Sequence, residues 1–213
     1  MHTLFFQLAA WVLLAAGIAG CTSHASEKKY HNTNAAGKGS GLDKTAKQKI
    51  QAHALAAATY VRQHKYNTRF CFLVDMSRPS GANRFFVYNL EKDSLELSGL
   101  VAHGRCNENW LEGRKYSNVS GSGCTSLGIY KIGGAYSGSF GLAYKLHGLD
   151  TSNNNAFNRY VVLHSHTCVP VSEVSPDEIC QSDGCPTVSP VFLSKLARKL
   201  DGSTKPVLLW IYE

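Results

Sequence analysis

A histidine and a later cysteine form a candidate pair of general base and nucleophile. An apolar run ends at His164-Ser165, and the segment Ser182-Asp183-Gly184-Cys185-Pro186-Thr187 follows it. Cysteine attacks as a thiolate, and histidine is the side chain best suited to accept its proton near neutral pH. Gly184 lets backbone N–H groups approach the reacting carbon, as an oxyanion hole requires. The pattern predicts a thiol-dependent acyl-transfer enzyme.

Other chemistries could use the same residues. A zinc site is one alternative, and its candidate ligands are His164, His166, Cys168, Cys180 and Cys185. Neither a Cys-x-x-Cys nor a His-x-x-x-His pair occurs, so we expect no metal. A papain-type protease is disfavoured because its cysteine precedes its histidine. A structural disulfide at Cys185 stays open, and His166 is a second candidate base because it shares a strand face with His164.

Residues 1–21 have the pattern of a bacterial lipoprotein signal peptide. An apolar run from Leu4 to Ala19 is followed by Gly20 and Cys21. The small residues before Cys21 predict its lipidation, and an ordinary cleaved signal is the alternative. Thr22 in place of Asp favours the outer membrane. We therefore expect a lipid-anchored protein of the cell envelope that faces the periplasm.

Composition divides the rest of the chain into a tether and one domain. Residues 22–41 are polar and lack apolar periodicity, so they predict a flexible tether. Residues 42–213 are enough for one domain with its own core. The net charge of +7 permits attraction to an anionic envelope. Alternatively, the basic residues only belong to a solvated tether and to one solvated helix face. Because the protein is expected to be exported, we do not expect nucleic acid as its partner.

The chain has seven cysteines, and export permits disulfides between them. If Cys21 is lipidated and Cys185 is the nucleophile, five cysteines remain. Cys71 begins an apolar strand and is expected to be a buried thiol. Two pairings would each brace a loop, namely Cys106 with Cys124 and Cys168 with Cys180. Spacing alone does not prove this connectivity.

The elements that must position these residues are mostly strands. Apolar periodicity predicts a helix capped by Asp43 and running to about Lys65, and a second helix from Pro190 to Leu200. Strand patterns occupy residues 70–74, 84–88, 95–101, 126–132, 142–146, 160–164 and 207–212. The sum predicts a mainly β domain with a few helices.

From about Leu73 to Tyr212 the chain resembles the catalytic domain of bacterial murein L,D-transpeptidases. The resemblance is carried by ordered segments: Val101-Ala102-His103-Gly104, Tyr116-Ser117-Asn118, Ser126-Leu127-Gly128-Ile129-Tyr130, Tyr136-Ser137-Gly138, Leu146-His147-Gly148-Leu149, Asn153-Asn154-Asn155-Ala156, Val162-Leu163-His164 and Leu208-Leu209-Trp210-Ile211-Tyr212. The nucleophile segment is similar to the branch that reads Ser-x-Gly-Cys-Pro in place of Ser-His-Gly-Cys. The resemblance implies a β-sandwich fold and peptidoglycan stem peptides as partners. We also expect no cofactor and a monomer.

The resemblance also implies a reaction. Cys185 would attack the carbonyl that joins the L-centre of a diamino acid to a terminal D-alanine, and the resulting thioester would pass to an amine. Water as the acceptor would make the protein a carboxypeptidase, and an idle Cys185 would leave a non-catalytic peptidoglycan-binding lipoprotein. His164 would be the base, oriented by the carbonyl of Ser165. The N–H groups of Gly184 and Cys185 would stabilise the oxyanion.

The residues expected to contact substrate are Ser182, Asp183, His166, His103 and Arg159. His103 is equally compatible with a turn satisfied by backbone. For Arg159, bracing of the loop before the catalytic strand is favoured over binding of a substrate carboxylate. The sequence departs from the commoner motif at two positions. Asp183 replaces a histidine, and its charge would raise the pKa of the Cys185 thiol unless it points away or pairs with a cation. Thr187 replaces the usual Asn or Arg.

Overall fold

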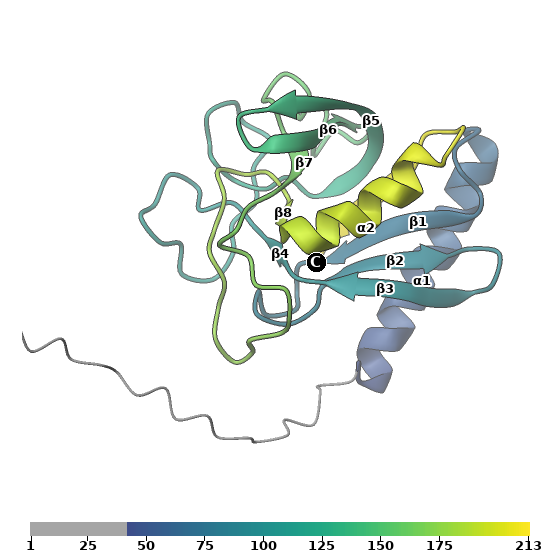
Figure 1. The fold of residues 1–213 in the computed structure, drawn as a ribbon, viewed down its shortest axis with the longest axis horizontal. Coiled ribbons are helices and arrows are strands. Elements are labelled where there is room, and N and C mark those ends of the chain that lie inside the picture. Colours follow the sequence, from purple (N-terminus) through teal and green to yellow (C-terminus); the bar gives the residue numbers. More distant parts are fainter. Residues whose placement is uncertain (1–41) are drawn as a thin grey trace, which may run out of the picture. The chain divides into compact units, whose positions relative to one another are not determined.

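The computed structural model describes residues 42–213 (Figure 1). The predicted signal peptide, Cys21 and the tether lie outside the described residues. The helices are α1 (Lys44–Gln63) and α2 (Pro190–Asp201). The strands are β1 (Phe70–Asp75), β2 (Phe85–Asn89), β3 (Ser94–Gly99), β4 (Val101–Ala102), β5 (Gly128–Gly138), β6 (Gly141–Gly148), β7 (Val162–Ser165), β8 (Thr187–Val188) and β9 (Leu208–Tyr212). Within this range, neither helix is long and apolar enough to cross a membrane.

The strands form one strongly curved sheet. Their order is β3-β2-β1-β9-β5-β6-β7-β8-β4, with parallel pairs at β1–β9 and β7–β8. Strands β3 and β4 stand at opposite ends of this order, yet only Leu100 separates them in the chain. The two ends of the sheet therefore meet, and the sheet is nearly closed. This confirms the predicted mainly β, sandwich-like fold with a few helices.

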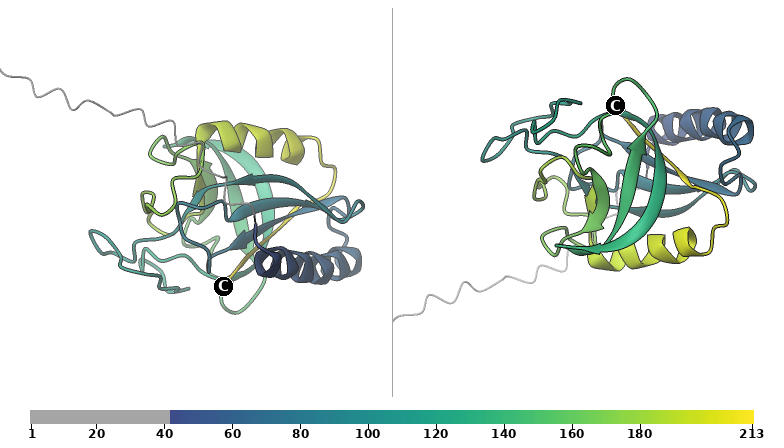
Figure 2. Two further views of the ribbon diagram at one scale, coloured as in Figure 1. Left: turned by 90° about the horizontal axis from the view of Figure 1, so that it is seen from below. Right: turned by 90° about the horizontal axis from the view of Figure 1, so that it is seen from above.

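The two helices cover opposite faces of the strands β1, β2 and β3 (Figure 2). Side chains of β1 alternate between them. Phe72 and Val74 join the cluster that contains the apolar face of α2, whereas Cys71 and Leu73 join the cluster with α1. Burial on both faces explains why β1 reads as a continuous apolar run. Cys71 is a buried free thiol, as predicted.

Both helices begin at polar residues that cap them. The Asp43 carboxylate accepts a hydrogen bond from the N–H of Ala46 at 2.7 Å, and the Ser189 hydroxyl accepts one from the N–H of Phe192 at 3.2 Å. Such caps satisfy N–H groups that have no partner inside the helix. The predicted boundaries of both helices agree with the structure to within two residues.

The structure differs from the predicted strands in four places. The strand predicted at 126–132 is β5, which begins at Gly128 and continues to Gly138. The predicted strand 95–101 is two strands, because β3 ends at Gly99 against the ring of Phe192 and β4 crosses to the other end of the sheet. The predicted strand 160–164 begins only at Val162, since Tyr160 has a φ of 58°. The two-residue strand β8 has too few residues to show a pattern in the sequence.

Candidate active site

A cavity of about 450 Å³ contains the predicted nucleophile and base. Its walls include Arg105, Trp110, Phe140, His164 and Cys185. These residues come from the loop after β4, the β5–β6 turn, the end of β7 and the segment before β8. The cavity therefore forms where four parts of the chain converge.

The parallel pairing of β7 with β8 brings the histidine and the cysteine together. His164 pairs with Thr187, and Ser165 pairs with Val188. Cys185 precedes Thr187 by two residues, so in this parallel register it lies beside Val162 at the start of β7, two residues before His164. A backbone hydrogen bond of 3.0 Å from the N–H of His166 to the carbonyl of Val188 extends this pairing beyond the strand ends.

Both ring nitrogens of His164 have partners in the protein. Nδ1 lies 3.2 Å from the carbonyl oxygen of Ser165, and Nε2 lies 2.9 Å from the hydroxyl of Thr187. A carbonyl only accepts, so we assign the ring hydrogen to Nδ1 and the lone pair to Nε2. The ring of Phe140 stacks on His164 with the centroids 4.5 Å apart. Nε2 is thus the nitrogen that can accept a proton.

The environment keeps His164 neutral. The side chain is 5% exposed, and this burial lowers its pKa below the usual 6.5. The hydrogen bond to the Ser165 carbonyl raises the pKa, and the neighbouring His166 lowers it. A histidine with a lowered pKa is unprotonated at neutral pH, which is the form that a general base requires.

Cys185 is a half-buried free thiol. Its Sγ accepts a hydrogen bond from the N–H of Val162 at 3.4 Å and lies 3.8 Å from the carbonyl of Tyr160. Burial raises the pKa of the thiol, the Val162 N–H lowers it, Asp183 raises it and Arg159 lowers it. Because burial has the largest effect, the resting state is the thiol. A base must remove its proton before the sulfur can attack.

The turn before the nucleophile depends on Gly184 and Ser182. Gly184 has a φ of 108°, and a Cβ there would lie 2.7 Å from the carbonyl oxygen of Cys124. The Ser182 hydroxyl accepts a hydrogen bond from the N–H of Gly184 at 3.2 Å and donates to the carbonyl of Cys185 at 2.7 Å. In this structure, the Ser182 side chain therefore holds the turn in shape.

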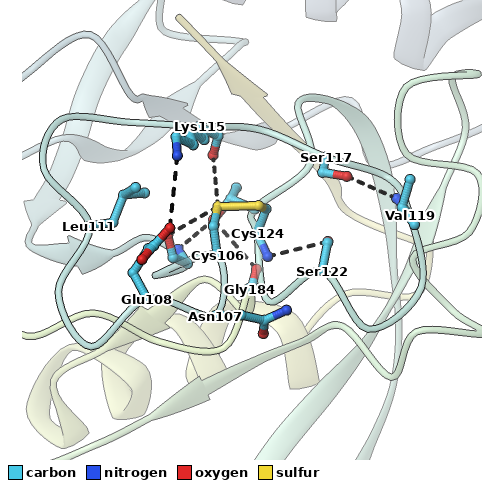
Figure 3. Close-up of a disulfide and its surroundings, with 12 residues drawn as sticks. Cys106, Asn107, Glu108, Leu111, Lys115, Ser117, Val119, Ser122, Cys124 and Gly184 are labelled. Atoms are coloured by element: carbon cyan, nitrogen blue, oxygen red, sulfur yellow. Dashed lines mark hydrogen bonds and ion pairs between the residues drawn. A yellow bond between two sulfur atoms is a disulfide. The ribbon is translucent and has the colours of Figure 1, made fainter.

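Two disulfides brace the surroundings of this turn, and both pairings were predicted. Cys106–Cys124 links the two sides of a loop beside Gly184 (Figure 3). Cys168–Cys180 closes the segment between β7 and the nucleophile, and it borders the cavity. The first bridge holds the Cys124 carbonyl against Gly184, so it supports the turn that carries the nucleophile.

Arg159 and His103 take bracing positions, which were the alternatives to substrate contact. Arg159 donates four hydrogen bonds to the loop 117–126, including one of 2.7 Å to the carbonyl of Cys124. His103 is 2% exposed, and its Nδ1 accepts a 2.9 Å hydrogen bond from Arg84. Neither side chain lines the cavity. In this structure both side chains therefore bond to protein groups outside the cavity lining, and a contact of either with substrate stays a prediction.

The other residues predicted to contact substrate border the cavity. Ser182, Asp183 and His166 all line it. Nδ1 of His166 accepts a hydrogen bond from the N–H of Cys168 at 3.1 Å, and the rings of His166 and Phe140 meet edge to face. Asp183 pairs with a cation, because its carboxylate lies 2.7 Å from Nε of Arg105.

Sequence reasoning missed several residues of the cavity wall. Phe140 lies in the β5–β6 turn, and Trp110 lies in the loop after β4. The side-chain amide of Gln181 exchanges two hydrogen bonds with the backbone of Leu111, at 2.8 and 2.9 Å, and so positions the neighbouring Trp110. These contacts join distant parts of the chain. The glycines on both sides of the Phe140 turn were the single local signal of an exposed turn residue.

The zinc alternative lacks a ligand set in the described part of the chain. No three His, Cys, Asp or Glu side chains in residues 42–213 are grouped so that they could hold a metal ion. Cys168 and Cys180, two of the suspected ligands, are joined in a disulfide.

Solved structures similar to this chain include the helical cell shape determining protein Pgp2 from Campylobacter jejuni, with 13% identity and a TM-score of 0.45. That match covers 68% of this chain and 47% of the other. An L,D-transpeptidase from Mycobacterium smegmatis has 12% identity, coverages of 68% and 59% and a TM-score of 0.40. An Enterococcus faecium L,D-transpeptidase has 10% identity, coverages of 68% and 50% and a TM-score of 0.39. This chain thus spans about half of each of these structures.

Comparison with curated proteins finds no significant match. The family model of the L,D-transpeptidase catalytic domain matches residues 42–212, which includes the whole described sheet, both helices and the cavity with Cys185 and His164. The chain therefore belongs to the L,D-transpeptidase catalytic domain family.

Proposed function

We propose that the protein is a peptidoglycan L,D-transpeptidase with Cys185 as nucleophile and His164 as general base. The observation that carries the proposal is one cavity lined by a free thiol and a histidine with a lowered pKa, in a chain of this family. The acyl donor is a stem peptide that ends in a diamino acid followed by D-alanine.

The first half-reaction forms a thioester. When the Thr187 hydroxyl turns from Nε2 of His164 to the carbonyl of Cys185, which lies 3.2 Å from it, Nε2 is free to take the proton of the Cys185 thiol. The sulfur then attacks the carbonyl carbon of the diamino acid. The Cys185 N–H stabilises the oxyanion, joined by the Gly184 N–H when this group leaves the Ser182 hydroxyl. The imidazolium then protonates the amine of D-alanine as the C–N bond breaks. The Ser165 carbonyl stabilises the imidazolium through Nδ1.

The second half-reaction transfers the acyl group. An amine on a neighbouring stem peptide attacks the thioester, His164 accepts a proton from it, and Cys185 leaves as the sulfur anion and regains a proton from the imidazolium. Water in place of the amine would give an L,D-carboxypeptidase. A Cys185 that never reacts would leave a non-catalytic peptidoglycan-binding protein. These two alternatives are separate outcomes of the tests below.

Acylation by a carbapenem tests the nucleophile. Intact-protein mass spectrometry should show one added carbapenem on the wild type and on Cys71→Ala, the matched control that removes the buried thiol. The Cys185→Ala variant should gain no mass. A folded wild-type protein that stays unmodified would contradict the enzymatic proposal. The remaining alternative would then be a non-catalytic peptidoglycan-binding protein.

Product analysis tests the acceptor and the base. Purified tetrapeptide-containing muropeptides should give cross-linked dimers and free D-alanine with the wild type. Tripeptide products without cross-linked dimers would show that the protein is an L,D-carboxypeptidase and not a transpeptidase. His164→Gln should lower the rate of acylation by about a hundredfold or more, since a general base typically contributes that much.

We further propose that Cys21 is lipidated and anchors the protein in the cell envelope, facing the periplasm. Support comes from the apolar run and the small residues that precede Cys21. Wild-type protein should incorporate an alkyne-labelled fatty acid and fractionate with membranes. Cys21→Ser should do neither, and labelling of this variant would contradict the proposal.

A further inference from the structure

The cavity beside Cys185 contains a guanidinium that has no role in the proposed chemistry. Among the described residues that line the cavity, Arg105 is the one lysine or arginine. A second arginine, Arg159, lowers the pKa of Cys185, but it does not line the cavity and is committed to four hydrogen bonds with the loop 117–126. Arg105 is therefore the cation that a bound molecule can reach.

The backbone holds Arg105 beside the nucleophile segment. Gly104 forms a bridge with Ser182, and the N–H of Arg105 donates to the carbonyl of Ser182 at 2.8 Å. A Cβ at Gly104 would lie 2.8 Å from the Cα of Gly184, so the two segments touch at this point. Arg105 thus starts from a fixed position close to Cys185.

Asp183 fixes the direction of the guanidinium. Its carboxylate accepts from Nε of Arg105 at 2.7 Å, and Nη1 donates to the carbonyl of Glu108 at 3.4 Å. A guanidinium has five N–H donors, and these two contacts leave three for a ligand. The side chain of Arg105 is 42% exposed, so these donors are accessible. An arginine held in this way suits a carboxylate, which it can bind through two parallel hydrogen bonds.

We propose that Arg105, positioned by Asp183, binds the C-terminal carboxylate of the acyl donor. This inference rests on the proposed function, in which the donor ends in D-alanine. The carboxylate of that residue lies one residue beyond the carbonyl that Cys185 attacks. Arg105 contacts Asp183, which lies two residues from Cys185 in the chain. Asp183 then contributes to substrate binding, because it orients the Arg105 guanidinium that recognises the C-terminal carboxylate of the donor.

The test compares two donors that differ in one group. One is a tetrapeptide with a free C-terminal carboxylate, and the other is the same peptide with a C-terminal amide. Wild-type protein should have a KM about tenfold to a hundredfold lower for the carboxylate, which is the range expected for hydrogen bonds to a charged group. Arg105→Gln should raise the KM for the carboxylate to that of the amide and leave kcat and the amide reaction nearly unchanged.

Two further variants complete the test. Lys115→Gln removes a cation from the same loop that does not line the cavity, and it should keep the wild-type preference. Arg105→Lys keeps the charge without the planar fork and should keep part of the preference, so it also serves if Arg105→Gln fails to fold. A preference that persists in Arg105→Gln, or an equal loss on both donors, would overturn the inference. A wild type that turns over neither donor would instead overturn the proposed function.

Discussion

Asp183 places negative charge near a thiol that must lose its proton. The carboxylate raises the pKa of Cys185, after burial as the largest effect and against the lowering by the Val162 N–H. The 2.7 Å contact with Arg105 neutralises part of this charge. The residue is 74% exposed, so water screens it as well. The contact with Arg105 and the solvent therefore reduce the amount by which Asp183 raises the pKa of Cys185, while Asp183 also orients Arg105.

This arrangement predicts a gain in thiol reactivity when the charge is removed. Asp183→Asn should lower the pKa of Cys185, so iodoacetamide should alkylate it faster at pH 7 to 8 than in the wild type. Peptide mapping should show no label on Cys71, because burial raises the pKa of that thiol to about 12. An unchanged rate at Cys185 would mean that Arg105 and solvent cancel the effect of Asp183.

Gly184 has a conformation that a side chain would not tolerate. We predict that Gly184→Ala lowers kcat/KM by about a hundredfold, as expected for a small displacement of a reacting group. Gly113→Ala is the control, because Gly113 also has a positive φ, of 70°, but its Cβ would meet no atom within 4 Å. Similar losses in both variants would attribute the effect to backbone strain rather than to the contact with Cys124.

The pairing of β7 with β8 accounts for the geometry of the site at the level of elements. A parallel pair needs a long connection between its strands, and here this connection carries the Cys168–Cys180 bridge and the nucleophile turn. The loop after β4 approaches from the other side, because β4 pairs with β8. The cavity lies between these connections, so its shape depends on how firmly they are held.

The Cys106–Cys124 bridge should therefore affect both stability and rate. Replacing both cysteines by serine should lower the free energy of unfolding by about 3 kcal/mol, the usual value for a loop of this size. It should also lower kcat/KM, because the Cys124 carbonyl would no longer be held against Gly184. Urea unfolding and steady-state kinetics check the two effects. A loss of stability at full kcat/KM would limit the bridge to a stabilising role.

At the scale of the whole molecule, closure of the sheet buries a cation beneath the site. Arg84 is fully buried and donates two hydrogen bonds to the carbonyl of Val101 and one to Nδ1 of His103. Burial, with the charges of Arg84 and Arg114, lowers the pKa of His103 from 6.5 to about 4. His103 must therefore stay neutral in the folded protein, since its protonation would place a second positive charge beside Arg84.

This buried pair predicts a dependence of stability on pH. Between about pH 4 and 6.5 the unfolded state binds the proton that folded His103 excludes, so stability should fall as pH decreases through this window. The effect of this one group is on the order of 3 kcal/mol. Urea unfolding at pH 7.5 and pH 4.5 should show a smaller difference for His103→Gln, which keeps an acceptor for Arg84. His64→Gln, at the exposed C-cap of α1, is the control and should show the same difference in stability between the two pH values as the wild type.

The sequence by itself determined the features that depend on local patterns. The cap at Asp43, the start of the second helix at Pro190 and the apolar runs of β1 and β9 are readable because side-chain periodicity and capping act over a few residues. The nucleophile segment was readable because its Gly-Cys-Pro context is contiguous. The two disulfides could be proposed but not proved, since spacing limits connectivity without deciding it.

The tertiary structure alone decided which side chains meet at the cavity. The pairing of Arg105 with Asp183, the stacking of Phe140 on His164 and the placement of Arg159 behind the site join segments far apart in the chain. Such contacts follow from the closure of the sheet and the β7–β8 register, and neither leaves a local pattern in the sequence. The role of Asp183 beside Cys185 was undecidable until the partner of its charge was known.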